Sequence, residues 1–99
     1  MAEVLLTFHC ARSDAETIGA ALHGIAQAPV HVRDEMVLGR DFDDAGAAEK
    51  VTGQLRRTAL EMVLEERLIE QAVAAVETSR RRFPVRWQAV PVLMRGRVA

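Results

Sequence analysis

The fold is decided by the stretch EVLLTFHC at residues 3–10 and by the tetrad Ser13-Asp14-Ala15-Glu16 that follows it. Side chains of the first stretch alternate in direction and are largely apolar on both sides, which is typical of a central β-strand. The tetrad has the pattern of a capping box, in which Ser13 and Glu16 satisfy amides at the start of a helix. A strand that leads into a helix indicates the first half of a β-α-β unit.

The predicted helix carries its apolar residues on one stripe, at the spacing of a helix that buries a single side. These residues are Ala15, Ile18, Leu22, Ile25 and Ala26. Gly24 and Pro29 mark the end of the helix. A second strand is predicted over residues 30–38, because apolar side chains alternate there with one exception at Asp34.

The second half of the chain repeats this order. A third strand is predicted over residues 55–65 and a second helix over residues 66–82, with arginines 80–82 in its last turn, where cations suit the negative helix end. The apolar stripe of this helix consists of Leu68, Ile69, Ala72, Val73 and Val76. A fourth strand is predicted over residues 85–93. Pro91 cannot donate to a strand ladder, which places this strand at an edge or a bulge.

The order β-α-β-β-α-β predicts a single α+β domain over residues 1–99, namely a ferredoxin-like plait with a four-stranded antiparallel sheet and both helices on one face. The other face of the sheet is open. The residues expected there are Leu5, Thr7, Ala59 and Val63. An exposed patch of this kind usually marks an interface, so we expect copies of the chain to cover it. Assembly would also stabilise a chain too short for a large core.

Charge is distributed unevenly along the chain. Residues 1–50 hold four basic and nine acidic side chains, whereas residues 51–99 hold nine basic and five acidic ones. From Arg80 to Arg97 there are six arginines and no acid. Such asymmetry indicates an anion site or complementary subunit faces, and the alternative is a solvated surface. Residues 39–50, rich in glycine and aspartate, are predicted to form a loop.

Composition excludes several classes of function. With a formal charge of −1, the chain is not a generally basic nucleic-acid binder. An RNA-recognition module would display stacking aromatics on its central strands, and only Phe8 is present there. The sequence contains no asparagine, which acylphosphatase chemistry on this fold needs, and no glycine-rich phosphate loop. We therefore expect a non-enzymatic protein without a cofactor and without a nucleic-acid partner.

One cysteine, Cys10, permits no disulfide within the chain, which is typical of a reducing compartment. The N-terminal residues lack the basic start of a signal peptide, and no run approaches the roughly 18 apolar residues of a membrane span. We expect a cytoplasmic protein without membrane insertion.

Two sets of residues are candidates for binding. The side chains that suit a soft or borderline metal are His9, Cys10, His23 and His31. Because His9 and Cys10 are adjacent on a strand, they point to opposite faces, and a metal site would need ligands from two chains. The second set is the run from Thr78 to Arg82, whose hydroxyl and guanidinium groups suit phosphate. The alternatives are ordinary polar histidines and arginines that stabilise a helix end.

The arrangement of elements resembles the PII-like signalling proteins over nearly the whole chain, and the resemblance is stronger in the second half. Three features of this chain are similar to the pattern of those proteins: a helix that ends at Thr78, a basic turn after it, and a strand with the sequence WQAVPV at residues 87–92. The stretch AEKVTGQLRR at residues 48–57 and the ending with Gly96-Arg97 resemble a short branch of this superfamily. Members of that branch are commonly encoded beside heavy-metal efflux pumps of the resistance-nodulation-division type.

This resemblance implies a homotrimeric sensor that binds a small anionic ligand or a nucleotide between subunits. The implied ligand-binding residues are Gly39, Arg40, Ser79, Arg80, Arg81, Arg95 and Arg97. The loop at 39–50 would contact a partner such as a membrane efflux protein. The chain departs from the pattern because it has no tyrosine to modify and because Ser79-Arg80-Arg81-Arg82 replaces the usual glycine run. The alternative is a copper- or zinc-binding protein or adaptor similar to the CutA type.

Overall fold

The computed structural model describes residues 2–38 and 54–99. Strand β1 (Glu3–Ala11) leads through a 3-10 turn (Arg12–Asp14) into helix α1 (Ala15–His23), which is followed by strand β2 (His31–Leu38). Strand β3 (Gln54–Glu65) leads through a second 3-10 turn (Glu66–Leu68) into helix α3 (Ile69–Glu77), and strand β4 (Arg86–Pro91) follows. The predicted order of elements is therefore confirmed.

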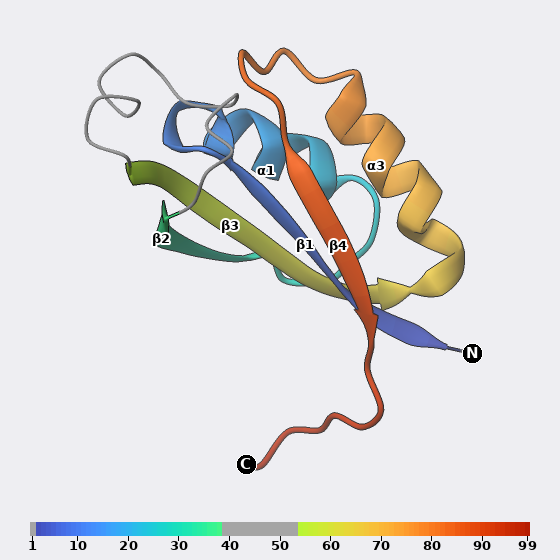
Figure 1. Cartoon of the computed structure of the whole chain (residues 1–99). Helices are drawn as coiled ribbons and strands as arrows, with labels where there is room; N and C mark the ends of the chain where they lie inside the picture. The colour runs from blue at the N-terminus through green and yellow to red at the C-terminus, as the bar shows by residue number, and fades with distance from the viewer. Residues whose placement is uncertain (1, 39–53) are drawn as a thin grey trace.

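The strands form one antiparallel sheet in the order β2-β3-β1-β4. Both helices cover the same face of this sheet (Figure 1). The predicted ferredoxin-like plait is therefore confirmed. Pro91 is the last residue of β4, and β4 is an edge strand, as its missing N–H requires.

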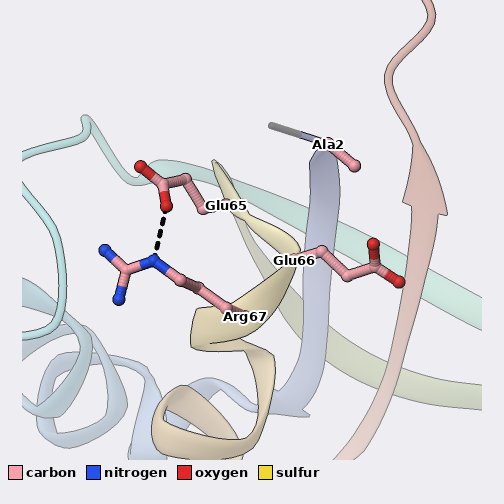
Figure 2. A pocket seen from close by; sticks show the side chains of 4 residues that line it. All are labelled: Ala2, Glu65, Glu66 and Arg67. Carbon is pink, nitrogen blue, oxygen red and sulfur yellow. Dashed lines mark hydrogen bonds and ion pairs between the residues drawn. The ribbon is translucent and has the colours of Figure 1, made fainter.

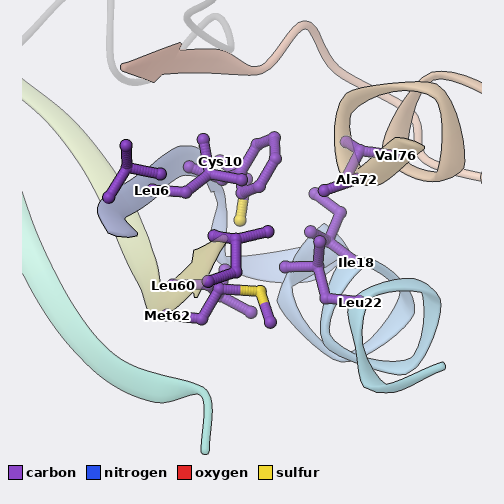
Figure 3. Close-up of a cluster of buried hydrophobic side chains, with 11 residues drawn as sticks. Leu6, Cys10, Ile18, Leu22, Leu60, Met62, Ala72 and Val76 are labelled. Carbon is purple, nitrogen blue, oxygen red and sulfur yellow. The ribbon is translucent and has the colours of Figure 1, made fainter. Parts of the chain in front are cut away.

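The hydrophobic core lies between the sheet and the two helices (Figure 3). Alternate residues of β1 and β3 point into it, and the apolar stripes of α1 and α3 meet them from the other side. The core residues are Val4, Leu6, Phe8, Cys10, Ile18, Leu22, Leu60, Met62, Leu64, Ala72 and Val76. The register explains this layer, because Leu6 pairs with Met62 and Phe8 pairs with Leu60 on one face.

The capping-box prediction is wrong. The residue that precedes α1 is Asp14, and neither its side chain nor that of Ser13 caps the helix. The Asp14 carboxylate instead accepts hydrogen bonds from the backbone amides of Arg82 and Phe83, at 2.9 and 3.0 Å. A contact across 68 residues of sequence therefore takes the place of the local cap.

The prediction that the second helix reaches residue 82 is also wrong, because α3 ends at Glu77. The hydroxyl of Thr78 donates to the carbonyl of Ala74 at 3.1 Å, and that of Ser79 donates to the carbonyl of Val76 at 2.5 Å. These bonds occupy carbonyls at the end of the helix, and the chain turns away toward Asp14. The arginines at 80–82 therefore lie in a turn rather than in the last turn of a helix.

Strand β2 is an exposed edge strand. Its apolar side chains Val32, Met36 and Leu38 are 60, 48 and 70% exposed. The alternation of apolar residues in the sequence therefore does not produce a buried face on this strand. No helix in the described part of the chain has the length and apolar character that a membrane crossing requires.

Candidate functional site

The face of the sheet opposite the helices carries a polar network. Strand register places alternate residues of all four strands on this face. Its polar and charged members include Thr7, His9, Arg33, Glu35, Arg57, Glu61, Arg86 and Gln88. The open face is therefore the part of the fold where charged groups from distant segments meet.

Glu61 connects three strands of this face. Its carboxylate accepts a hydrogen bond from the Thr7 hydroxyl at 2.8 Å and another from the Arg33 guanidinium. The bond from Arg33, and after it the bond from Thr7, hold the pKa of the Glu61 carboxyl below its usual range. The network thus ties the edge strand β2 to β3 and β1 through ionised groups.

His9 and Glu35 meet across β3. In the register, Ala59 of β3 lies opposite His9, whereas Arg57 of β3 lies opposite Glu35. The imidazole Nδ1 of His9 reaches the Glu35 carboxylate diagonally across β3, which links β1 to β2.

A hollow of about 250 Å³ opens beside this pair. It is lined by His9, Glu35, Val37, Leu55, Arg57 and Arg86. Arg57 is only 6% exposed although it lies on the face away from the helices, and its Nη1 donates to the carbonyl of Arg56 at 2.8 Å. A buried guanidinium, an exposed arginine and an ion pair thus surround one concave site.

The expectation of a bare apolar patch on this face is corrected by the structure. Thr7 and Ala59 are buried, and Leu5 and Val63 are half-buried. In the described residues the exposed large apolar side chains gather on the edge strands and on the extended C-terminal segment. They are Val32, Met36, Val37, Leu38, Trp87, Val90, Leu93, Met94 and Val98.

The basic turn after α3 is held by contacts within the chain. Arg81 donates from Nε to the carbonyl of Val76 at 3.3 Å and from Nη1 to the carbonyl of Phe83 at 3.1 Å. The half-buried Ser79 bonds back to Val76, while Arg80 is exposed. A hollow of about 300 Å³ beside this turn includes Arg81 and Trp87 in its lining.

The two described groups of predicted ligand residues lie at opposite ends of β4 (Figure 1). Residues 79–83 precede the strand, whereas Arg95 and Arg97 follow it. The guanidinium of Arg95 holds the carboxylate of Glu3 through two bonds of 3.0 and 2.8 Å, and Arg97 is exposed. Within one chain these groups do not converge. Gly39 and Arg40, like the predicted loop at 39–50, lie outside the described residues.

The four predicted metal ligands lie apart from one another. Cys10 is buried in the core on the opposite side of the sheet from His9, and its thiol faces the carbonyl of Thr58 at 3.5 Å. Burial, and after it the charge of Asp14, raises the pKa of this thiol to about 11. His23 and His31 are exposed at the end of α1 and the start of β2. The described residues contain no group of three or more side chains arranged to hold a metal ion.

A further hollow of about 320 Å³ lies at the start of the second 3-10 turn, lined by Ala2, Glu65, Glu66 and Arg67 (Figure 2). Arg67 Nε donates to Glu65 at 2.6 Å, and the amide of Glu66 donates to the carbonyl of Ala2 at 3.0 Å. Arg67, the one cationic side chain in the described lining, is thus paired with Glu65 of the same hollow. This hollow is therefore a weaker candidate for binding an anion than the sheet face.

The pairing of Asp14 with the basic turn and the clustering of Arg57 with Glu35 were not anticipated from the sequence. Counting every second residue along 55–65 would have placed Arg57, Ala59 and Glu61 on one face. Nothing in the local sequence indicates that Asp14 contacts Arg82, because the two are joined only by the packing of α1 beside α3.

A family model for proteins of unknown function, DUF3240, matches residues 3–99. The chain belongs to the DUF3240 family. No protein with a curated function is significantly similar to it in sequence.

Solved structures share its fold at low sequence identity. A DUF3240 family protein from Shewanella baltica OS155 is 13% identical with a TM-score of 0.77, and the match covers 98% of this chain and 97% of that one. A candidate PII-like signalling protein from Thermus thermophilus is 12% identical with a TM-score of 0.61, over 93 and 88% of the two chains. A Bacillus cereus protein related to NIF3 is 12% identical with a TM-score of 0.71, over 97% of this chain but 26% of that chain.

Proposed function

We propose that this DUF3240 protein is a non-enzymatic regulatory protein of the PII-like type, which assembles into a homotrimer and responds to a small anionic ligand. The proposal rests on the fold it shares with a candidate PII-like signalling protein and on its own exposed edges.

The observation that carries the proposal is the apolar character of two different sheet edges. Strand β2 exposes Val32 and Leu38, and strand β4 exposes Trp87 and Val90. Unpaired strand edges with apolar side chains favour association. Because the two edges differ, a contact between them is heterologous, and such contacts form closed rings when the rotation allows. A trimeric ring is the form that the family resemblance implies.

Sedimentation equilibrium tests the assembly. The wild type is expected at about three times the chain mass of 10.9 kDa. Val32→Lys on β2 and Val90→Lys on β4 are expected to shift the protein toward monomer while the circular dichroism of the fold persists. Ala20→Lys, on the exposed side of α1, is the matched control and leaves the mass unchanged. A monomeric wild type, or edge variants with the wild-type mass, would contradict the proposal.

The anionic ligand is proposed to contact Arg80 and Ser79 of one subunit and Arg95 or Arg97 of a neighbour. Since these groups lie at opposite ends of β4, only assembly would bring them to one cleft. Calorimetric titration with ATP, ADP, AMP and cyclic nucleotides tests this idea. Binding is expected to weaken in Arg80→Gln, and the absence of heat with every nucleotide at millimolar concentration would exclude nucleotides as the ligand.

The partner is proposed from the family resemblance alone, as a membrane efflux protein contacted through residues 39–50. Replacement of residues 40–47 by a short glycine-serine linker tests it. Co-purification with the efflux protein from membranes is expected for the wild type and not for this variant. Equal recovery of both would contradict the proposed contact.

A further inference from the structure

The hollow at His9, Glu35, Arg57 and Arg86 is separate from the residues to which the proposed nucleotide or anion site is assigned. We propose that this hollow is a second binding site, and that it takes a small organic carboxylate. The acidic group of the ligand lies toward Arg57 and Arg86, and its apolar part lies against Val37 and Leu55.

The charges around the hollow favour an anion. Two guanidinium groups and one carboxylate line it, and Glu35 is already engaged by His9. The described lining of the hollow therefore carries one more cationic than anionic side chain, which favours an anion over a cation. A guanidinium carries five donors in a planar fork that matches a carboxylate, so one arginine can serve several acceptors.

The position of Arg57 strengthens this attraction. Its side chain is only 6% exposed, and a charge in such surroundings interacts more strongly with a counterion than one in bulk water. The bond from Nη1 to the carbonyl of Arg56 fixes its orientation, so little side-chain entropy is lost when a ligand binds. The residue is therefore preorganised toward the hollow.

The size and walls of the hollow favour an organic ligand over an inorganic ion. Its volume of about 250 Å³ is near the lower end of small-molecule pockets. Val37 and Leu55 supply an apolar wall from neighbouring positions of β2 and β3, since the two residues pair in the register. A second hollow, of about 480 Å³, shares His9 and Arg86 and extends the site along β4 to Gln88.

Amide chemical shifts of ¹⁵N-labelled protein, titrated with benzoate as the probe, test the proposal. Benzoate is expected to shift signals of residues 35–37, 55–57 and 86, while neutral benzamide of the same shape shifts none of them. Acetate is expected to bind more weakly than benzoate because it lacks the apolar part. Arg86→Gln, at an exposed position, is expected to weaken benzoate binding by about tenfold or more.

Arg56→Gln is the matched control, because Arg56 is the neighbour of Arg57 on the other face of β3, and it is expected to bind benzoate as the wild type does. Arg57→Met is expected to abolish binding. If that variant fails to fold, Val37→Glu, at an exposed position, provides the second test by placing an acid in the hollow. Equal binding of benzoate and benzamide, or wild-type affinity in Arg86→Gln, would overturn the proposal. Arg80→Gln is expected to leave benzoate binding unchanged, which separates this site from the proposed nucleotide site.

Discussion

Asp14 shows how one residue can hold together segments far apart in the chain. It is 3% exposed, and both carboxylate oxygens accept backbone amides from the turn after α3. These amides would otherwise be available to a phosphate, as paired backbone N–H groups often are. The internal carboxylate therefore shapes the basic turn and at the same time occupies two of its donors.

Replacement of Asp14 by asparagine is expected to lower the free energy of unfolding by about 2 kcal/mol, because a buried charge-assisted acceptor is lost and an NH₂ group faces an amide. Urea unfolding at one protein concentration measures the change. The control, Glu16→Gln on the exposed side of α1, is expected within about 0.5 kcal/mol of the wild type. An unfolding free energy for Asp14→Asn equal to that of the control would show that the turn does not depend on Asp14.

Cys10 behaves as a core residue. At pH 8, a thiol with a pKa of about 11 holds about 100-fold less thiolate than one at the ordinary value of 9.0. Iodoacetamide is therefore expected to modify the folded protein at least about 100-fold more slowly than the urea-unfolded chain. Equal rates in the two states would contradict the buried position.

At the scale of elements, β2 is joined to the sheet by charged groups more than by apolar burial. Its apolar side chains are largely exposed, while Arg33 bonds to Glu61 on the neighbouring β3 and Glu35 bonds to His9 on β1. Asp34 adds an acceptor for the Thr58 hydroxyl at 3.2 Å. The attachment of this edge is therefore sensitive to the ionisation of carboxylates.

Glu61 is expected to make stability depend on pH. Its pKa is lowered in the folded state, so its contribution is present above the pKa of the unfolded chain and is lost as the pH falls through the folded value. Between about pH 6 and about pH 3, the wild type is expected to lose more stability than Glu61→Gln. Thermal unfolding across this range measures both slopes.

The matched control for this prediction is Glu70→Gln on the exposed side of α3, which is expected to retain the wild-type slope. If Glu61→Gln and the wild type lose the same stability on acidification, the network around Glu61 does not contribute to the attachment of β2.

At the scale of the whole molecule, the core of the described residues lies between the sheet and the helices, and several large apolar side chains outside it are exposed. Leu22 is fully buried, whereas Leu93 is 98% exposed in the segment after β4. Two residues of the same type therefore occupy opposite extremes of burial. Comparing the same substitution at both positions therefore separates the stability that the core contributes from the stability that an assembly could add.

The same substitution at these two positions is expected to have very different effects. Leu22→Ala is expected to lower the free energy of unfolding by about 3 kcal/mol, because it leaves a cavity in the core. Leu93→Ala is expected to change it by less than about 0.5 kcal/mol. Denaturant unfolding monitored by the fluorescence of Trp87 compares them. A large loss in Leu93→Ala would show that this segment packs against another part of the protein.

The sequence by itself determined the order of elements, the plait and most of the core. Apolar residues at strand or helix spacing, such as Leu6, Ile18 and Val76, lie on one face of their element. Because that face must be buried, the elements can pack together in few ways. The edge position of β4 was also predictable, because Pro91 lacks the N–H that a central strand needs.

Only the tertiary structure decided which polar groups meet. The tetrad at residues 13–16 indicated a local cap, but the Asp14 carboxylate binds backbone amides that lie 68 and 69 residues away. The hollow on the sheet face needs all four strands in register, because each strand contributes to its lining. Hydrophobic periodicity fixes the direction of apolar side chains along one element, but hydrogen bonds and ion pairs between elements depend on distances that arise only when the elements pack.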